Sequence, residues 1–197
     1  IIEKNLSDPL NKTWCFWDNK DSIWSDFIDK KWSDIRFKNI DTEIDYDLKQ
    51  LRYNMISSSK FFKKIKKIVE SKLKISLVYD DVLNISDENE TVNVRSKNGQ
   101  YTANKVFNSI PKFTPYDDHK NFPKLLQHFK GWTIKTNTSC FDPSIATIMD
   151  FSIDQKNETR FFYLLPKKND EALIEFTLFT KNLIEENEYE SEIKKYI

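Results

Sequence analysis

A carboxyl group inside an apolar stretch is the best candidate for acid catalysis in this sequence. Glu175 lies within residues 172–179, which are rich in apolar and aromatic side chains, lack Gly and Pro, and therefore predict a strand. Alternation along a strand puts Glu175 on one face with Leu173, Thr177 and Phe179. Because apolar surroundings disfavour the charged form, the pKa of such a carboxyl is raised and it can donate a proton. The spacing leaves one alternative open, a Glu on the wet face of a half-exposed sheet.

Aromatic residues cluster near the beginning of the chain. All but one of the five tryptophans fall within residues 11–37, and residues 11–17 are too aromatic for an ordinary exposed loop. Clustered rings such as Trp14 and Trp17 can line an apolar pocket or stabilise a cation. Structural packing is the alternative reading of the same cluster.

Composition excludes several classes of function. The 31 basic residues balance the 31 acidic residues, so bulk electrostatics gives no reason to expect a nucleic-acid partner. Cys15 and Cys140 lie far apart and form no motif, and the two histidines have no partner at ligand spacing, so we expect no metal site. No apolar run approaches the length of a membrane span. A reducing compartment is the default expectation.

The first part of the chain has the order of elements of a nucleotide-binding α/β domain. Residues 1–3 predict the end of a buried parallel strand that closes in Glu3, and such an acid binds a ribose in dinucleotide-binding units, although a chance strand end is the alternative. Residues 60–73 predict a helix with one apolar and one lysine-rich face, suited to an anionic membrane or to packing on a sheet. Short strands are predicted at residues 74–77, 82–86, 91–96 and 106–109.

The second part predicts a different architecture. A proline-rich linker is expected over residues 111–123. Consecutive strands with short turns then predict an antiparallel meander, at residues 127–137, 145–153, 160–165 and 172–180, followed by a helix over 184–196. The predicted fold class is therefore α/β (α+β), with a partial Rossmann-like domain over residues 1–113 and an antiparallel-sheet substrate domain over 114–197.

Four segments together resemble the lycopene cyclases, flavoproteins that close the ends of linear carotenoids into rings. The segment NKTWCFW at residues 11–17 resembles the family's DRTWCFW, with Lys12 where the family usually has Arg. PSIATIMDF at 143–151 is similar to PxxATxMDF, and RFFYLLP at 160–166 is similar to RFxYxLP. LIEFT at 173–177 falls where the family carries FLEET.

The resemblance implies roles for the residues that match. Glu175 takes the position of the first Glu of FLEET, which is held to be essential for cyclisation, whereas Phe176 replaces the second Glu. This departure argues against a mechanism that needs two adjacent acids. Asp150 is expected to be the proton acceptor or to orient Glu175, with a structural Asp as the alternative. The expected substrate cavity is aromatic, and its lining residues are Trp14, Trp17, Phe162 and Tyr163.

The resemblance also implies a cofactor, a substrate and a cellular location. The family uses reduced FAD without net redox change, with NAD(P)H as the electron source, so Glu3 would bind the adenosine ribose and Val82 would present backbone to the adenine. The expected substrate is lycopene or a related linear carotenoid, which implies peripheral attachment to the cytoplasmic face of a membrane. Only two glycines are present, so no glycine-rich phosphate loop can form. We therefore expect an internal fragment that cannot hold FAD or turn over alone.

Two other functions stay open at this point. A flavoprotein reductase or hydroxylase acting on a polyprenyl substrate would consume NAD(P)H in proportion to product, whereas a cyclase would not. A non-catalytic lipid-binding module would leave Glu175 as an ordinary surface residue beside a shallow, wet cavity.

Overall fold

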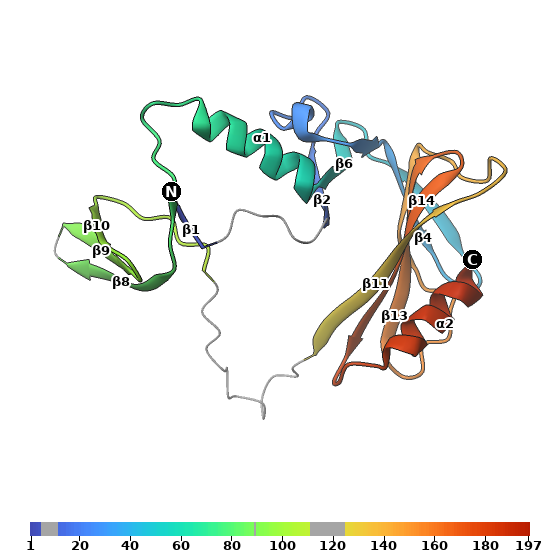
Figure 1. Cartoon of the computed structure of the whole chain (residues 1–197). Coiled ribbons are helices and arrows are strands. Elements are labelled where there is room, and N and C mark those ends of the chain that lie inside the picture. The colour runs from blue at the N-terminus through green and yellow to red at the C-terminus, as the bar shows by residue number, and fades with distance from the viewer. Residues whose placement is uncertain (5–11, 89, 111–124) are drawn as a thin grey trace. The chain divides into compact units, whose positions relative to one another are not determined.

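The computed structural model describes residues 1–4, 12–88, 90–110 and 125–197, and the chain divides into two compact units (Figure 1). Unit 1 consists of Ile1–Trp14 and Ile56–Pro115, and unit 2 consists of Cys15–Met55 and Tyr116–Ile197. Most described elements are strands, with two α-helices, so the mixed α/β class is confirmed. The predicted linker over 111–123 lies outside the described residues.

Unit 1 combines a parallel strand pair, a helix and a small antiparallel sheet. Strand β1 pairs in parallel with β7, as expected for the predicted strand end at Glu3, and β8, β9 and β10 form the sheet in the order β10-β9-β8. The elements are β1 (Ile2–Glu3), α1 (Ser58–Glu70), β7 (Val78–Tyr79), β8 (Val82–Glu88), β9 (Thr91–Ser96) and β10 (Gln100–Ala103).

Two strand predictions in unit 1 were wrong. Residues 74–77 form no strand, because the pairing with β1 begins only at Val78. Residues 106–109 form no strand either, and the third strand of the small sheet is β10. The turn before β10 is fixed by the buried carboxylate of Asp80, which accepts hydrogen bonds from Ser96 Oγ (2.6 Å) and the Asn98 amide (3.0 Å). The strand that follows this turn is therefore Gln100–Ala103, and residues 106–109 lie beyond the small sheet.

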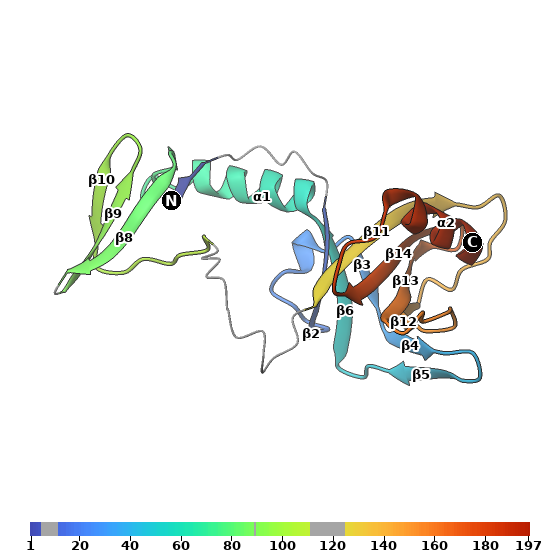
Figure 2. The same ribbon diagram turned by 90° about the horizontal axis from the view of Figure 1, so that it is seen from below.

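Unit 2 is built on a six-stranded sheet in the order β11-β14-β13-β12-β4-β5. Strands β12, β13 and β14 are consecutive antiparallel neighbours, as in the predicted meander. The place predicted for the first strand was wrong, because β11 pairs with β14 and not with β12. The helix α2 lies against this part of the sheet (Figure 2). The elements are β4 (Asp34–Lys38), β5 (Glu43–Asp47), β11 (Leu126–Lys135), β12 (Ile145–Asp150), β13 (Thr159–Lys168), β14 (Glu171–Thr180) and α2 (Glu186–Tyr196).

Each face of the large sheet has its own core. On one face, Ile193 of α2 packs against Phe162, Phe176 and neighbouring apolar side chains. On the other face, Trp32, Tyr53 and Met55 pack against Leu165 and its neighbours. These residues belong to a three-stranded sheet in the order β2-β6-β3, which is accompanied by a short 3-10 helix. Its elements are β2 (Thr13–Asn19), η1 (Ser25–Phe27), β3 (Lys30–Trp32) and β6 (Leu51–Ser57).

Residues 15–55 belong to unit 2, which differs from the predicted division into 1–113 and 114–197. The reason is long-range pairing: β4 joins the large sheet parallel to β12, with Ile145 opposite Asp34. The indole of Trp32 also donates a hydrogen bond to the Pro166 carbonyl oxygen (2.9 Å). These contacts between distant parts of the chain attach the early strands to the later sheet.

Candidate active site

Glu175 lies in the middle of β14, between a tyrosine on one neighbouring strand and a glycine on the other. Its direct partners are Tyr163 on β13 and Gly131 on the edge strand β11. Directly opposed residues project from the same face of a sheet, so Tyr163 flanks the carboxyl on one side and no side chain flanks it on the other. The carboxyl is half-buried, and its Oε1 accepts a hydrogen bond from Thr177 Oγ1 (3.3 Å).

Burial raises the pKa of the Glu175 carboxyl, and the hydrogen bond from Thr177 opposes this shift. Burial first, and then the charge of Glu175, raises the pKa of Tyr163. Burial likewise raises the pKa of the Cys15 thiol to about 11 and that of Tyr53 above its usual range, with Glu175 adding to both shifts. The site is therefore a group of weak acids whose uncharged forms are favoured.

Aromatic rings surround this group of weak acids. Trp17 lies 4.6 Å from the ring of Tyr53, and Trp32 lies 5.7 Å from it on the buried side. Phe161 lies 5.3 Å from Tyr163. Trp17 stays 48% exposed, so this aromatic surface is partly open.

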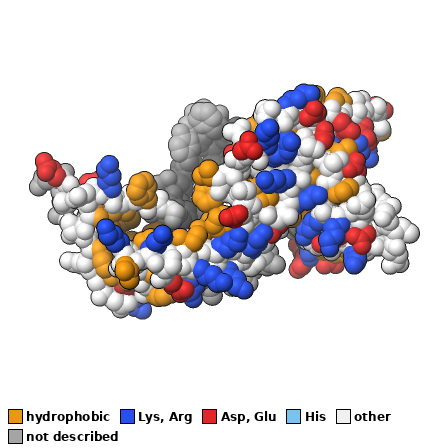
Figure 3. Space-filling model, turned by 90° about the horizontal axis from the view of Figure 1, so that it is seen from above, with side chains coloured by type: hydrophobic (Ala, Val, Ile, Leu, Met, Phe, Trp, Pro, Cys, Tyr) orange, Lys and Arg blue, Asp and Glu red, His pale blue; other side chains and the backbone are white. Residues whose placement is uncertain are grey.

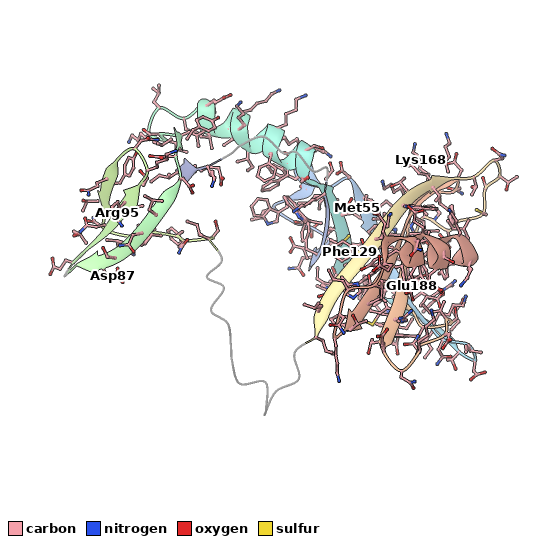
Figure 4. The ribbon with its side chains drawn as sticks, turned by 60° about the horizontal axis from the view of Figure 1, so that its bottom comes forward. Met55, Asp87, Arg95, Phe129, Lys168 and Glu188 are labelled. Carbon is pink, nitrogen blue, oxygen red and sulfur yellow. The ribbon has the colours of Figure 1, made fainter. Side chains whose placement is uncertain are left out.

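The surface continues along the same face of the sheet. Phe179, two positions beyond Thr177 on β14, stacks against Phe161 at 6.4 Å. Phe129 of β11 lies opposite Thr177 and is 59% exposed (Figure 4). An apolar ligand would therefore meet several ring faces next to one carboxyl group.

Two residues predicted for the site lie on the opposite face of the sheet. Phe162 is fully buried on the α2 side, stacked between Phe176 (4.9 Å) and Tyr196 (4.0 Å). Its assignment to the cavity beside Glu175 was wrong, because it is adjacent in sequence to Tyr163 and adjacent residues of a strand face opposite ways.

Asp150 also belongs to the α2 face. Its buried carboxylate accepts hydrogen bonds from the Tyr196 hydroxyl (2.8 Å) and from the amide and hydroxyl of Ser152, and Lys38 Nζ lies 3.6 Å away. The predicted contact with Glu175 is therefore not formed. The partners of Asp150 support the structural alternative, because they satisfy the carboxylate and attach α2 to the sheet.

Trp14 is described within unit 1. Its ring makes edge-on contacts with Phe61 and Phe62 of α1, each with centroids 5.8 Å apart, and these two rings contact each other. Its assignment to the substrate cavity stays a prediction.

Sequence reasoning missed three residues of the site, namely Cys15, Tyr53 and Gly131. Cys15 lies inside the aromatic segment that drew attention to Trp14 and Trp17, so its proximity to them was the available signal. Tyr53 lies at the site because β6 packs against the large sheet. No local sequence pattern predicts this packing. Gly131 could have been found, because it is one of two glycines and interrupts a predicted strand.

The residues predicted to bind FAD belong to unit 1. Glu3 ends β1, which is parallel to β7, and the carboxyl end of parallel strands is where nucleotides bind in this class of sheet. Val82 begins β8 and lines a shallow hollow with Leu83, Asn84, Ile85, Asn108 and Ile110. Both positions are compatible with an adenosine group.

Two kinds of site are absent from the described ranges, a metal-binding cluster and a membrane-spanning helix. No group of three or more His, Cys, Asp and Glu side chains could hold a metal ion there. Neither of the helices described is long and apolar enough to cross a membrane.

The fold is that of FAD-dependent oxidoreductases. A geranylgeranyl bacteriochlorophyll reductase-like protein from Thermoplasma acidophilum matches with a TM-score of 0.63 at 14% identity, covering 100% of this chain and 54% of that one. HpxO from Klebsiella pneumoniae, solved with FAD and uric acid, matches with a TM-score of 0.56 at 8% identity, covering 92% and 51%. The chain thus spans about half the length of these structures.

The family is shown by sequence. The profile described as "Lycopene cyclase protein" matches residues 1–197, the whole chain. The chain therefore belongs to the lycopene cyclase family. No protein of curated function matches it in sequence.

Proposed function

We propose that the protein containing this chain is a lycopene β-cyclase, an isomerase that closes the ends of linear lycopene into the rings of β-carotene. The observation that carries this proposal is Glu175, a half-buried carboxyl with a raised pKa on an aromatic sheet face in a member of this family. A carboxyl whose uncharged form is favoured by burial is suited to general acid catalysis.

The proposed reaction begins with proton transfer from the Glu175 carboxyl to a terminal alkene carbon. The new C–H bond leaves a tertiary carbocation, and the electron pair of a neighbouring double bond then forms the ring C–C bond. A ring carbon next to the resulting cation loses a proton, which restores a double bond. One proton is gained and one is lost, so the product is an isomer of the substrate.

The carboxylate left at Glu175 is our candidate for the base that takes the second proton, because Asp150 lies on the other face of the sheet. The rings of Tyr163 and Trp17 present negative π-faces that stabilise a nearby cation. Uncharged Tyr163 and Cys15 add no competing negative charge to the site. This face therefore combines one acid with surfaces that do not trap the cation.

We infer that the cofactor is FAD in its reduced form, with NAD(P)H as the electron source. Glu3 at the end of β1 would hold the ribose, and the Val82 backbone would lie against the adenine, as their places in unit 1 allow. Reduced FAD supplies an anionic ring system that stabilises positive charge without net oxidation or reduction.

Peripheral attachment to the cytoplasmic face of a membrane follows from the proposed substrate, which dissolves in lipid. Helix α1 offers a basic surface for it, since Lys63, Lys66 and Lys67 are exposed along with Phe62 and Ile68. Figure 3 shows Lys and Arg side chains gathered in the middle of the surface seen from above. Basic and apolar side chains together favour anionic bilayers.

The test uses the full-length protein with a lycopene supply. Glu175→Gln should lower β-carotene formation about 100-fold or more, the usual contribution of a general acid. Glu171→Gln is the matched control, because Glu171 lies on the same strand but pairs with Lys167 and Lys168. Undiminished product from the Glu175 variant would refute the proposal, and NAD(P)H consumed in proportion to product would favour the reductase or hydroxylase.

A further inference from the structure

Gly131 occupies an unusual place for a glycine. It lies in the interior of β11, with five residues of the strand before it and four after it, and its direct partner on β14 is Glu175. Glycine weakens a strand because it loses more backbone entropy and packs no side chain. The presence of glycine at position 131 therefore requires an explanation, such as the close approach of a ligand or of other protein atoms.

Protein atoms leave limited but sufficient room for a methyl group at this position. A Cβ at residue 131 would lie 3.3 Å from Leu173 Cδ1, 3.3 Å from the Ile174 carbonyl oxygen and 3.4 Å from Glu175 Cβ. These distances are tight, but none is below 3.0 Å, so alanine fits after shifts of a few tenths of an ångström. Backbone strain is not the reason either, because Gly131 has no positive φ. The new methyl group would lie directly beside the side chain of Glu175.

The surroundings of Gly131 are open on the Glu175 side. On β11, Phe129, Gly131 and Thr133 face that side and are exposed, whereas the alternate residues Trp132 and Ile134 pack against the α2 core. On the other flank of Glu175, the half-buried ring of Tyr163 occupies the corresponding position. Within the described sheet, the exposed flank of Glu175 is therefore the one at Gly131, beside the Leu173 side chain.

We propose that Gly131 is a specificity-determining residue, whose missing side chain leaves the space in which a methyl-branched hydrocarbon end reaches Glu175. This inference rests on the proposed function and extends it. A proton-accepting end that carries two methyl groups on its terminal carbon is wider than an unbranched chain. Phe129 and Thr133 border the space, and Glu175 lies at its inner end.

The experiment compares Gly131→Ala and Gly131→Val in the full-length protein, with Gly99→Ala as control. Gly99 is the other glycine of the chain and lies in the turn before β10 in unit 1. Two substrates are used: lycopene, and an analogue whose ends each lack one terminal methyl group. Dissociation constants come from quenching of tryptophan fluorescence, which needs no turnover, and kcat/KM comes from product formation. Melting temperatures report on folding.

We expect Gly131→Ala to weaken binding and turnover of lycopene about 10-fold while changing the dissociation constant of the smaller analogue less than about threefold. Gly131→Val should weaken binding and turnover of lycopene about 100-fold, and Gly99→Ala should match the wild type in both. Equal effects on both substrates together with a lowered melting temperature would overturn the proposal, because they would show a packing role. Wild-type affinity of both Gly131 variants for lycopene would also overturn it.

The same measurements test the cyclase proposal separately from the role of Gly131. If the wild type binds lycopene but forms no ring, the cyclase proposal fails. The ratio of the dissociation constants for the two substrates then still supports or overturns the role of Gly131 by the same criteria.

Discussion

Tyr163 and Glu175 lie directly opposite one another on neighbouring antiparallel strands, on the sheet face that α2 does not cover. Burial raises the pKa of both groups, and the charge of Glu175 adds to the shift of Tyr163. Ionising either group therefore makes the other harder to ionise. Burial favours the uncharged form of Glu175, and burial together with the charge of Glu175 favours the uncharged form of Tyr163, so a proton donor lies beside a ring.

The ring of Tyr163, more than its hydroxyl, is expected to matter for turnover. Tyr163→Phe keeps the π-face and should retain at least about half of the wild-type rate, whereas Tyr163→Leu should lose about 10-fold through weaker cation stabilisation. Single-turnover product formation measures both. If the Phe variant were as slow as the Leu variant, the hydroxyl would be the active group.

The raised pKa of Glu175 predicts how stability changes with pH. The folded protein holds this proton more tightly than the unfolded chain, whose Glu has a pKa near 4.3. The contribution of Glu175 to the free energy of unfolding is therefore fully present below about pH 4.3. It falls as the pH rises through the higher pKa of the folded state. Glu175→Gln removes the titration, so its free energy of unfolding relative to wild type should be more favourable at pH 7 than at pH 4.

Urea unfolding at the two pH values measures this difference. An unchanged difference between variant and wild type would show that Glu175 titrates as an exposed carboxyl.

Cys15 offers a second report on Glu175. Burial raises the pKa of its thiol to about 11, the interaction with Tyr53 opposes this shift, and the negative charge of Glu175 raises it further. In a Cys140→Ser background, which removes the exposed thiol, Glu175→Gln should lower the pH at which Cys15 is alkylated half-maximally. The pH dependence of the alkylation rate measures this, and no shift would place the carboxyl too far from Cys15.

Asp150 is predicted to matter for stability and not for turnover. Tyr196→Phe removes a hydrogen bond to this buried carboxylate and should cost about 1–3 kcal/mol of unfolding free energy. Asp150→Asn should be destabilised too, but its turnover per folded molecule should stay within about threefold of wild type, which is small beside the 100-fold or larger effect of losing a catalytic acid or base. Thermal unfolding and active-site-normalised rates test both statements. A stable but inactive Asn variant would return Asp150 to the mechanism.

The strands and the helix of unit 2 could be predicted, because their signals are local. Residues 172–180 and 184–196 carry the alternation and the spacing that a strand and a helix need. The parallel pairing of β4 with β12 could not be predicted, because it depends on contacts more than a hundred residues apart. The bounds of the two compact units differ from the predicted domain division for the same reason.

The site was predictable in its acid and less so in its surroundings. Strand alternation identified the face of Glu175, and the same rule applied to β13 would have rejected Phe162 once Tyr163 was accepted. Asp150 follows a register shift in β12, so alternation alone could not assign its face. Tyr53 arrives from a strand that was not predicted at all.

Cyclisation of lycopene in D₂O by the full-length protein is the decisive test of Glu175 as the proton donor, because a proton from a solvent-exchangeable carboxyl must enter the product. We expect one deuterium atom per ring, measured by mass spectrometry, no NAD(P)H consumed in proportion to product, and ring formation by Glu175→Gln lowered about 100-fold or more. Rings without deuterium, or rings formed as fast by the Gln variant, would contradict this role of Glu175.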